Sequence, residues 1–231
     1  MLEAITFVAI IVLLLAVIVS FVSLKRSSNP NDKILRIFLF LFFGSVAASL
    51  DFIVEFKGTS FDQWSYSKSV LLIGGLIPVE LPVMFFSFGI IMAVVAITPL
   101  RFDEAQLTRV SIQPSVDYFR LAVLALLFAI GASGYFLLGN VTALIFAVPA
   151  GLFGYDITLE NDRRRAIYFG LVAMISDIIF ENFVIGLAGY DYSGGFTLDV
   201  PLEYFLLAVA GFGLANVAYY RLFPVVISDK K

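Results

Sequence analysis

Residues 51–86 contain Asp51-Phe-Ile-Val-Glu55, then Trp64-Ser-Tyr66, then Gly75-Leu-Ile-Pro78-Val-Glu80. Residues 177–205 repeat the pattern as Asp177-Ile-Ile-Phe-Glu181, Tyr190-Asp-Tyr192 and Pro201-Leu-Glu203. Each copy places an Asp and a Glu four residues apart, then an aromatic pair flanking one residue, then Pro-x-Glu. Carboxylates are costly in apolar helices and mark functional sites there by default. Because the set occurs twice, the pattern indicates duplication of a unit that carries a site.

The composition is that of a membrane protein. Of the 231 residues, 61% are hydrophobic, and the mean hydropathy of +0.99 exceeds what a soluble domain needs. The net charge of −3 gives no support for nucleic-acid binding. Cys and His are both absent, which excludes disulfides and thiol nucleophiles and removes the usual neutral-pH base. We therefore expect no metal site and no cofactor, with any proton chemistry carried by Asp, Glu, Tyr, Lys or Arg.

Apolar runs predict seven transmembrane helices in a single membrane domain that crosses the cell membrane several times. The predicted helices span residues 2–24, 34–56, 78–98, 118–138, 141–155, 166–187 and 201–220. Pro78 and Pro201 suit the first position of a helix, where the missing N–H costs nothing. Glu80 and Glu203 would then lie in a first turn, where the helix dipole favours a carboxylate. The short apolar run 70–77 is interpreted as a lead-in or a partly re-entrant segment.

The basic residues predict the orientation. With seven helices and the N-terminus outside, Lys57 and Lys68 are the only external ones among the 15 Lys and Arg residues. This strong positive-inside bias places the C-terminus in the cytoplasm. The Arg163–Arg165 cluster is interpreted as a topology anchor.

The duplicated pattern and the helix order predict two parallel three-helix repeats. Repeat 1 covers about residues 2–98, a connector with the fourth helix covers about 99–138, and repeat 2 covers about 141–221. All six repeated acids then fall between the middle of the membrane and its outer edge. Residues four apart share a helix face, so Asp51 lies beside Glu55 and Asp177 beside Glu181.

Acids in such surroundings suit one type of chemistry. An apolar, aromatic environment disfavours the charged form of a carboxyl group and keeps it protonated. A protonated carboxylic acid can hand its proton to an electron-rich alkene. Ring faces then stabilise the carbocation, and a nearby carboxylate does so more strongly.

The first copy resembles the lycopene cyclase domain of the membrane-integral carotenoid cyclases. The resemblance rests on Trp64-Ser-Tyr66, the run from Gly75 to Glu80, and Phe85-Phe86. This family is known from two-subunit bacterial cyclases and from fungal fusions with phytoene synthase. The second copy looks like the partner repeat. The chain departs from the family at Leu81 and Tyr204, where a second acid usually follows the Glu.

The resemblance implies a redox-neutral isomerisation of an acyclic carotenoid such as lycopene within the lipid bilayer. An acid protonates the terminal double bond, the 5,6 double bond attacks the cation, and loss of a proton leaves a ring. The implied catalytic residues are Glu80, Glu203, Asp51, Glu55, Asp177 and Glu181, the first two as acid or charge stabiliser and the others as tuning groups or final base. The implied substrate-binding residues are Trp64, Tyr66, Phe85, Phe86, Tyr190 and Tyr192. A homo-oligomer or association with other carotenoid-pathway enzymes is also expected.

Other functions remain open. A carotenoid 1,2-hydratase would use the same protonation and trap the cation with water. A prenyltransferase would use the Asp-x-x-x-Glu spacing to bind Mg²⁺ and diphosphate. This alternative is disfavoured because the predicted external segments contain few basic residues that could bind the diphosphate. A carboxylate-relay transporter, or another non-enzymatic seven-helix protein, is the alternative of a different class. A retinal pigment is disfavoured because residues 201–220 contain no Lys. In a purely structural interpretation, the acids only complement helix dipoles, and the aromatic pairs only form a belt at the membrane–water interface.

Overall fold

A computed structural model describes residues 2–60, 64–66, 72–74, 77–98, 119, 122–123, 126–127, 140–179, 190–192 and 199–220. Within these ranges the chain forms the α-helices α1 (Leu2–Arg26), α2 (Pro30–Ser60), α3 (Glu80–Ile97), α6 (Asn140–Ile157), α7 (Arg163–Ile179) and α9 (Asp199–Tyr220). A 3-10 helix, η1 (Glu160–Asp162), joins α6 to α7. Four short strands complete the described part: β1 (Trp64–Tyr66), β2 (Leu72–Ile73), β3 (Ile77–Pro78) and β4 (Tyr190–Tyr192).

The helical character predicted from the apolar runs is confirmed. Six of the seven predicted helices correspond to the six α-helices of the described ranges. In the segment 118–138, the described residues 119, 122–123 and 126–127 are helical, and the rest lies outside the described residues. The count of seven helices and the two-repeat layout therefore stay predictions.

The two helices that carry Glu80 and Glu203 do not start where the sequence predicts. The segment 70–77 and Pro78 contribute a short antiparallel hairpin, in which Leu72 pairs with Pro78 and Ile73 with Ile77. Gly74 turns this hairpin at φ 62°, a backbone conformation that costs glycine little. Because Pro78 belongs to β3, α3 begins two residues later, at Glu80. In contrast, α9 begins at Asp199, so Glu203 lies one turn inside the helix.

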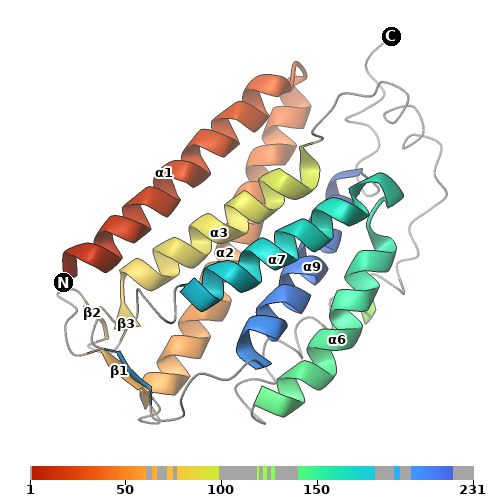
Figure 1. Cartoon of the computed structure of the whole chain (residues 1–231). Coiled ribbons are helices and arrows are strands. Elements are labelled where there is room, and N and C mark those ends of the chain that lie inside the picture. Colours follow the sequence, from red (N-terminus) through yellow and green to blue (C-terminus); the bar gives the residue numbers. More distant parts are fainter. Residues whose placement is uncertain are drawn as a thin grey trace.

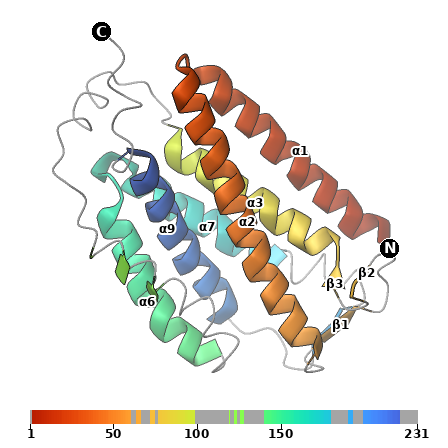
Figure 2. The same cartoon turned by 180° about the vertical axis from the view of Figure 1, so that it is seen from behind.

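The helices pack as two groups that meet at α3 and α9. Helix α3 packs against both α1 and α2, α9 packs against both α6 and α7, and α3 contacts α9. Figures 1 and 2 show that α1, α3, α6 and α9 begin at the end of the molecule that carries β1, whereas α2 and α7 begin at the opposite end. The largest buried cluster joins α2, α3 and α9 through residues such as Phe40, Val94 and Phe212.

The outer faces of the helices are apolar, as expected for contact with lipid. Three helical segments of the described chain are long and apolar enough to cross a membrane, namely Thr6–Arg26, Glu80–Ile97 and Leu202–Tyr220. Large hydrophobic side chains on the outside of α1 and α2 are widely exposed, with Phe21 and Ile34 each at 66%. In water such a surface would be costly, because burying apolar area is the main favourable term in folding. The structure is thus consistent with a membrane protein.

Glycines allow the central helices to approach their neighbours closely. A Cβ on Gly89 of α3 would lie 2.3 Å from the carbonyl oxygen of Phe43 in α2. A Cβ on Gly213 of α9 would lie 2.3 Å from the carbonyl oxygen of Gly154 in α6. Small residues at helix crossings are typical of membrane proteins, where packing drives helix association. Each group therefore contains a crossing that only glycine permits.

Candidate functional site

The two aromatic motifs lie side by side in one sheet. Strands β1 and β4 pair antiparallel, with Trp64 opposite Tyr192, Ser65 opposite Asp191 and Tyr66 opposite Tyr190. Strand β1 connects α2 to α3, and β4 connects α7 to α9, so residues more than a hundred positions apart in the chain are joined here. Both motifs fall between the predicted helices, and the sequence does not predict their pairing, because three-residue strands show no recognisable alternation of polar and apolar residues. The structure thus brings together Trp64-Ser-Tyr66 and Tyr190-Asp-Tyr192.

Candidate acids surround the same end of the molecule. Asp51 lies on the last third of α2, Glu80 opens α3 and Glu203 lies one turn into α9. Asp51 is 4% exposed and Glu203 5% exposed, and Glu80 is half-buried. Carboxyl groups are expensive to bury in apolar surroundings, so three of them at one end of an apolar bundle are unusual for a purely structural role.

A hydroxyl group from α1 contacts Glu80. Thr6 Oγ1 donates a hydrogen bond to Glu80 Oε1 at 2.9 Å. The second carboxyl oxygen, Oε2, is buried, and no donor for it lies among the described residues. Sequence reasoning missed Thr6, because one Thr in an apolar run carries no signal by itself. The pair links α1 to α3 at the end where β1 lies.

The two predicted phenylalanines have different surroundings. The Phe85 ring lies 6.3 Å from the Tyr204 ring, centroid to centroid, and so spans the contact between α3 and α9. Phe86 instead packs on α2, where a Cβ added to Gly44 would lie 2.9 Å from its ring. Phe85 is therefore placed next to the second group of helices, whereas Phe86 is a packing residue between α3 and α2.

The remaining predicted site residues are described in part or not at all. Glu55 lies on α2 and Asp177 on α7, but their side chains lie outside the described residues. Glu181 lies outside them altogether. For the strand residues Trp64, Tyr66, Tyr190 and Tyr192 the backbone is described, which fixes their pairing and no more.

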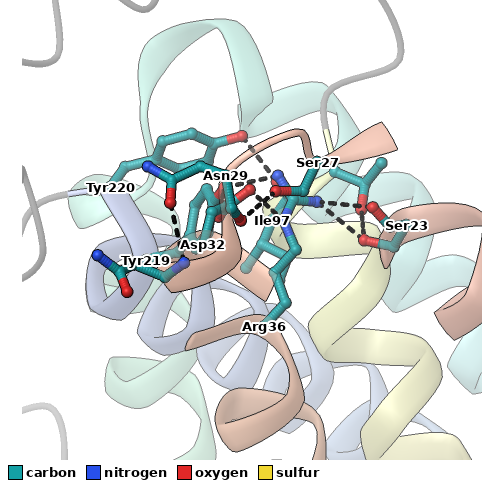
Figure 3. A network of polar contacts seen from close by, with 10 residues as sticks. Ser23, Ser27, Asn29, Asp32, Arg36, Ile97, Tyr219 and Tyr220 are labelled. Atoms are coloured by element: carbon teal, nitrogen blue, oxygen red, sulfur yellow. Dashed lines mark hydrogen bonds and ion pairs between the residues drawn. The ribbon is translucent and has the colours of Figure 1, made fainter. Parts of the chain in front are cut away.

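A second polar cluster lies at the opposite end of the helices. Arg36 is 4% exposed and bonds through Nε to Asp32 Oδ2 at 2.9 Å. Its other nitrogens donate to Ser23 Oγ at 2.9 Å and to the Tyr219 hydroxyl at 2.6 Å, and that hydroxyl donates to Asp32 Oδ1 at 2.6 Å. Figure 3 shows these groups converging on the Arg36 guanidinium from three helices. Every donor and acceptor named here is satisfied, so the cluster is a structural network rather than a site with open valences.

Side chains of α7 and α9 cap the last carbonyl groups of α3. Arg165 donates to the carbonyl oxygens of Val95 and Thr98, Asn216 to that of Ala96 at 3.0 Å, and Tyr220 to that of Ile97 at 2.8 Å. The final carbonyls of a helix lack intrahelical partners and carry the negative end of its dipole, which a guanidinium complements. The sequence interpretation of Arg163–Arg165 as a topology anchor is thus incomplete, because Arg165 also joins the two groups of helices.

The end of the bundle that carries β1 and β4 can thus offer proton donors, proton acceptors and ring faces in apolar surroundings. Within the described chain, no group of acidic residues has a metal-binding arrangement. Comparisons of the chain with protein-family models, with curated proteins and with solved structures find no match.

Proposed function

We propose that this protein is a membrane-embedded, lycopene cyclase-like enzyme that closes a ring at one end of an acyclic carotenoid. The observation that carries the proposal is the pairing of β1 with β4, since it unites the two aromatic motifs of the resemblance at one place. Buried Asp51 and Glu203, and half-buried Glu80, lie at the same end of the bundle. The layout of two parallel repeats, with the acids toward the outer face of the membrane, is part of this proposal.

The proposed reaction needs only a proton that is given and returned. Glu80 or Glu203, in its neutral form, donates a proton to the terminal double bond of the carotenoid. The 5,6 double bond attacks the resulting cation, and a new carbon–carbon bond closes a six-membered ring. A carboxylate removes a proton from the ring and restores the acid. No oxidant or reductant takes part, which agrees with a site built from carboxyl groups and aromatic rings.

Aromatic rings from both groups of helices have a defined role in this scheme. The Phe85 and Tyr204 rings meet at the contact of α3 and α9, between the starts of the two helices that bear Glu80 and Glu203. Ring faces stabilise a passing cation without reacting with it. In the proposed complex, a carotenoid end group binds beside this contact of α3 and α9, near both an acid and a ring.

The test is to express the chain in bacterial cells that accumulate lycopene and to separate the pigments by chromatography with mass detection. We expect a product of unchanged mass with a cyclic end group. Glu80→Gln and Glu203→Gln should each lower ring formation by about a hundredfold, the usual size of a general-acid contribution. Glu160→Gln is the matched control, because Glu160 is exposed on η1 at the opposite end.

The pigments distinguish the competing functions. A product heavier by one water molecule would replace the cyclase by the 1,2-hydratase, which uses the same acid. Unchanged lycopene, with the protein present in the membrane, would overturn carotenoid chemistry altogether and favour the transporter class.

A further inference from the structure

Thr6 contacts the candidate acid Glu80 from another helix. Its Oγ1 lies 2.9 Å from Glu80 Oε1, and the two residues are separated by 74 positions. A hydroxyl donates one hydrogen, so this bond assigns Oε1 as an acceptor. The contact therefore distinguishes the two oxygens of the Glu80 carboxyl group.

Tight packing beneath the pair holds α1 against α3. Ala9 of α1 forms a buried cluster with Leu81 and Met84 of α3, and Val8 packs against it. Ala9 is 4% exposed, and Leu81 and Met84 are each 1% exposed. Ala9 is three residues from Thr6 and shares its helix face. The backbone that carries Thr6 is thus fixed relative to the start of α3.

The other oxygen of Glu80 has a different environment. Oε2 is buried, and within the described chain it has no hydrogen-bond partner. A buried carboxylate oxygen without a donor is costly, whereas the hydroxyl of a neutral carboxyl group needs an acceptor instead. In the proposed reaction that acceptor is the double bond of the substrate. A neutral Glu80 with its hydrogen on Oε2 and its carbonyl oxygen at Oε1 therefore matches the environments of both oxygens.

We propose that Thr6 is a positioning residue that fixes the Glu80 carboxyl group with Oε1 as its carbonyl oxygen and Oε2 as its proton-donating atom. The catalytic meaning of this assignment rests on the proposed function, but the bond itself does not. By holding one oxygen, Thr6 selects the face of the carboxyl group that is turned toward the substrate. Productive orientation of this kind is a large part of what an active site contributes to rate.

The test uses infrared spectroscopy of the protein reconstituted in lipid. The carbonyl stretch of neutral Glu80 is identified as the band that disappears in Glu80→Gln. A hydrogen bond to the carbonyl oxygen lowers the frequency of this stretch, so Thr6→Val should shift the band upward, and Thr6→Ser should leave it near the position in the unmodified protein. Thr158→Val is the matched control, because its buried hydroxyl donates to Gly154 O at 2.6 Å at the other end of the bundle.

The same variants are then assayed in lycopene-accumulating cells. Thr6→Val should reduce ring formation by about tenfold, the effect of one lost hydrogen bond on an oriented group, while Thr6→Ser retains most of it. A band that stays in place in Thr6→Val, or the absence of any neutral Glu80 band, overturns the inference. A band that shifts as expected in a protein that forms no rings supports the Thr6 assignment and overturns the proposed function, so the two failures are distinguishable.

Discussion

Arg36 shows how a charged side chain is kept inside this apolar bundle. Its guanidinium meets Asp32, Ser23 and Tyr219, and its Cζ atom lies 5.0 Å from the centre of the Tyr219 ring. A buried ion pair gains little net stability, because removing two charges from water costs about as much as their attraction returns. Removing one partner alone is different, since it leaves the other charge buried without compensation. A single substitution in this network should therefore destabilise the fold much more than a double substitution that removes both charges.

We predict that Arg36→Met lowers the free energy of unfolding by about 3–5 kcal/mol, because Asp32 stays buried and, among the described residues, keeps only the Tyr219 hydroxyl as a partner. The double variant Arg36→Met with Asp32→Asn should recover a large part of this loss. Unfolding in detergent micelles, followed by circular dichroism, measures both effects. Lys33→Met is the control, because Lys33 is an exposed cation between the two residues. A double variant no more stable than the single one would show that the unpaired charge is not the cause.

At the residue scale, the sequence indicates candidate polar groups only where their chemistry makes them conspicuous. Acids stand out in an apolar helix, so Asp51, Glu80 and Glu203 were all identified from the pattern, and the structure places them at one end of the bundle. Thr6 was missed because a hydroxyl group is cheap to place in a helix and has no characteristic spacing. Its hydrogen bond to Glu80 spans 74 positions of the chain, and a local sequence pattern cannot contain such a contact.

At the element scale, hydropathy located the helices but not their ends. Helix α2 runs from Pro30 to Ser60, well beyond the apolar run 34–56, because a helix continues through polar residues once it has formed. The start of α3 was misplaced by two residues, because Pro78 suits both the first turn of a helix and the edge of a short hairpin. The pairing of β1 with β4 depends on tertiary structure, and the sequence of neither strand indicates it.

The crossing of α6 and α9 yields a prediction about small residues. Gly213→Ala should destabilise the fold by about 1–3 kcal/mol, because the new methyl group meets the rigid backbone of Gly154. Gly211→Ala, two residues away on α9, is the matched comparison. There the methyl group meets the end of the flexible Met92 side chain, and alanine gains about 1 kcal/mol of helix propensity.

Thermal unfolding of both glycine variants in the same detergent separates the two cases. Gly213→Ala should lower the unfolding temperature by several degrees, and Gly211→Ala should leave it unchanged or raise it. If the unfolding temperature falls equally in both variants, α9 tolerates added volume at neither position. The close approach of Gly213 to Gly154 would then not be the cause of the loss.

At the scale of the whole molecule, the two groups of helices are joined at both ends. At one end Arg165, Asn216 and Tyr220 cap the carbonyl groups of α3, and at the other β1 pairs with β4. Between them α3 and α9 pack directly. A site formed at the β1–β4 end is consequently shared by the two groups, which is the arrangement that a duplicated motif requires if its copies act together.

The register of β1 and β4 provides the most direct test of that arrangement. Ser65 and Asp191 are directly opposite, and opposed residues of antiparallel strands have Cα atoms about 4.5–5.5 Å apart, within the range of a disulfide bond. The chain has no cysteine of its own, so Ser65→Cys with Asp191→Cys introduces the only possible pair. Mild oxidation in membranes should link them, giving a faster-migrating band on non-reducing gels and one cross-linked peptide by mass spectrometry. Ser65→Cys with Glu160→Cys, at opposite ends, should stay unlinked. If only the second pair linked, or if the first pair linked between molecules alone, the two motifs would not meet within one chain, and the shared site would have no structural basis.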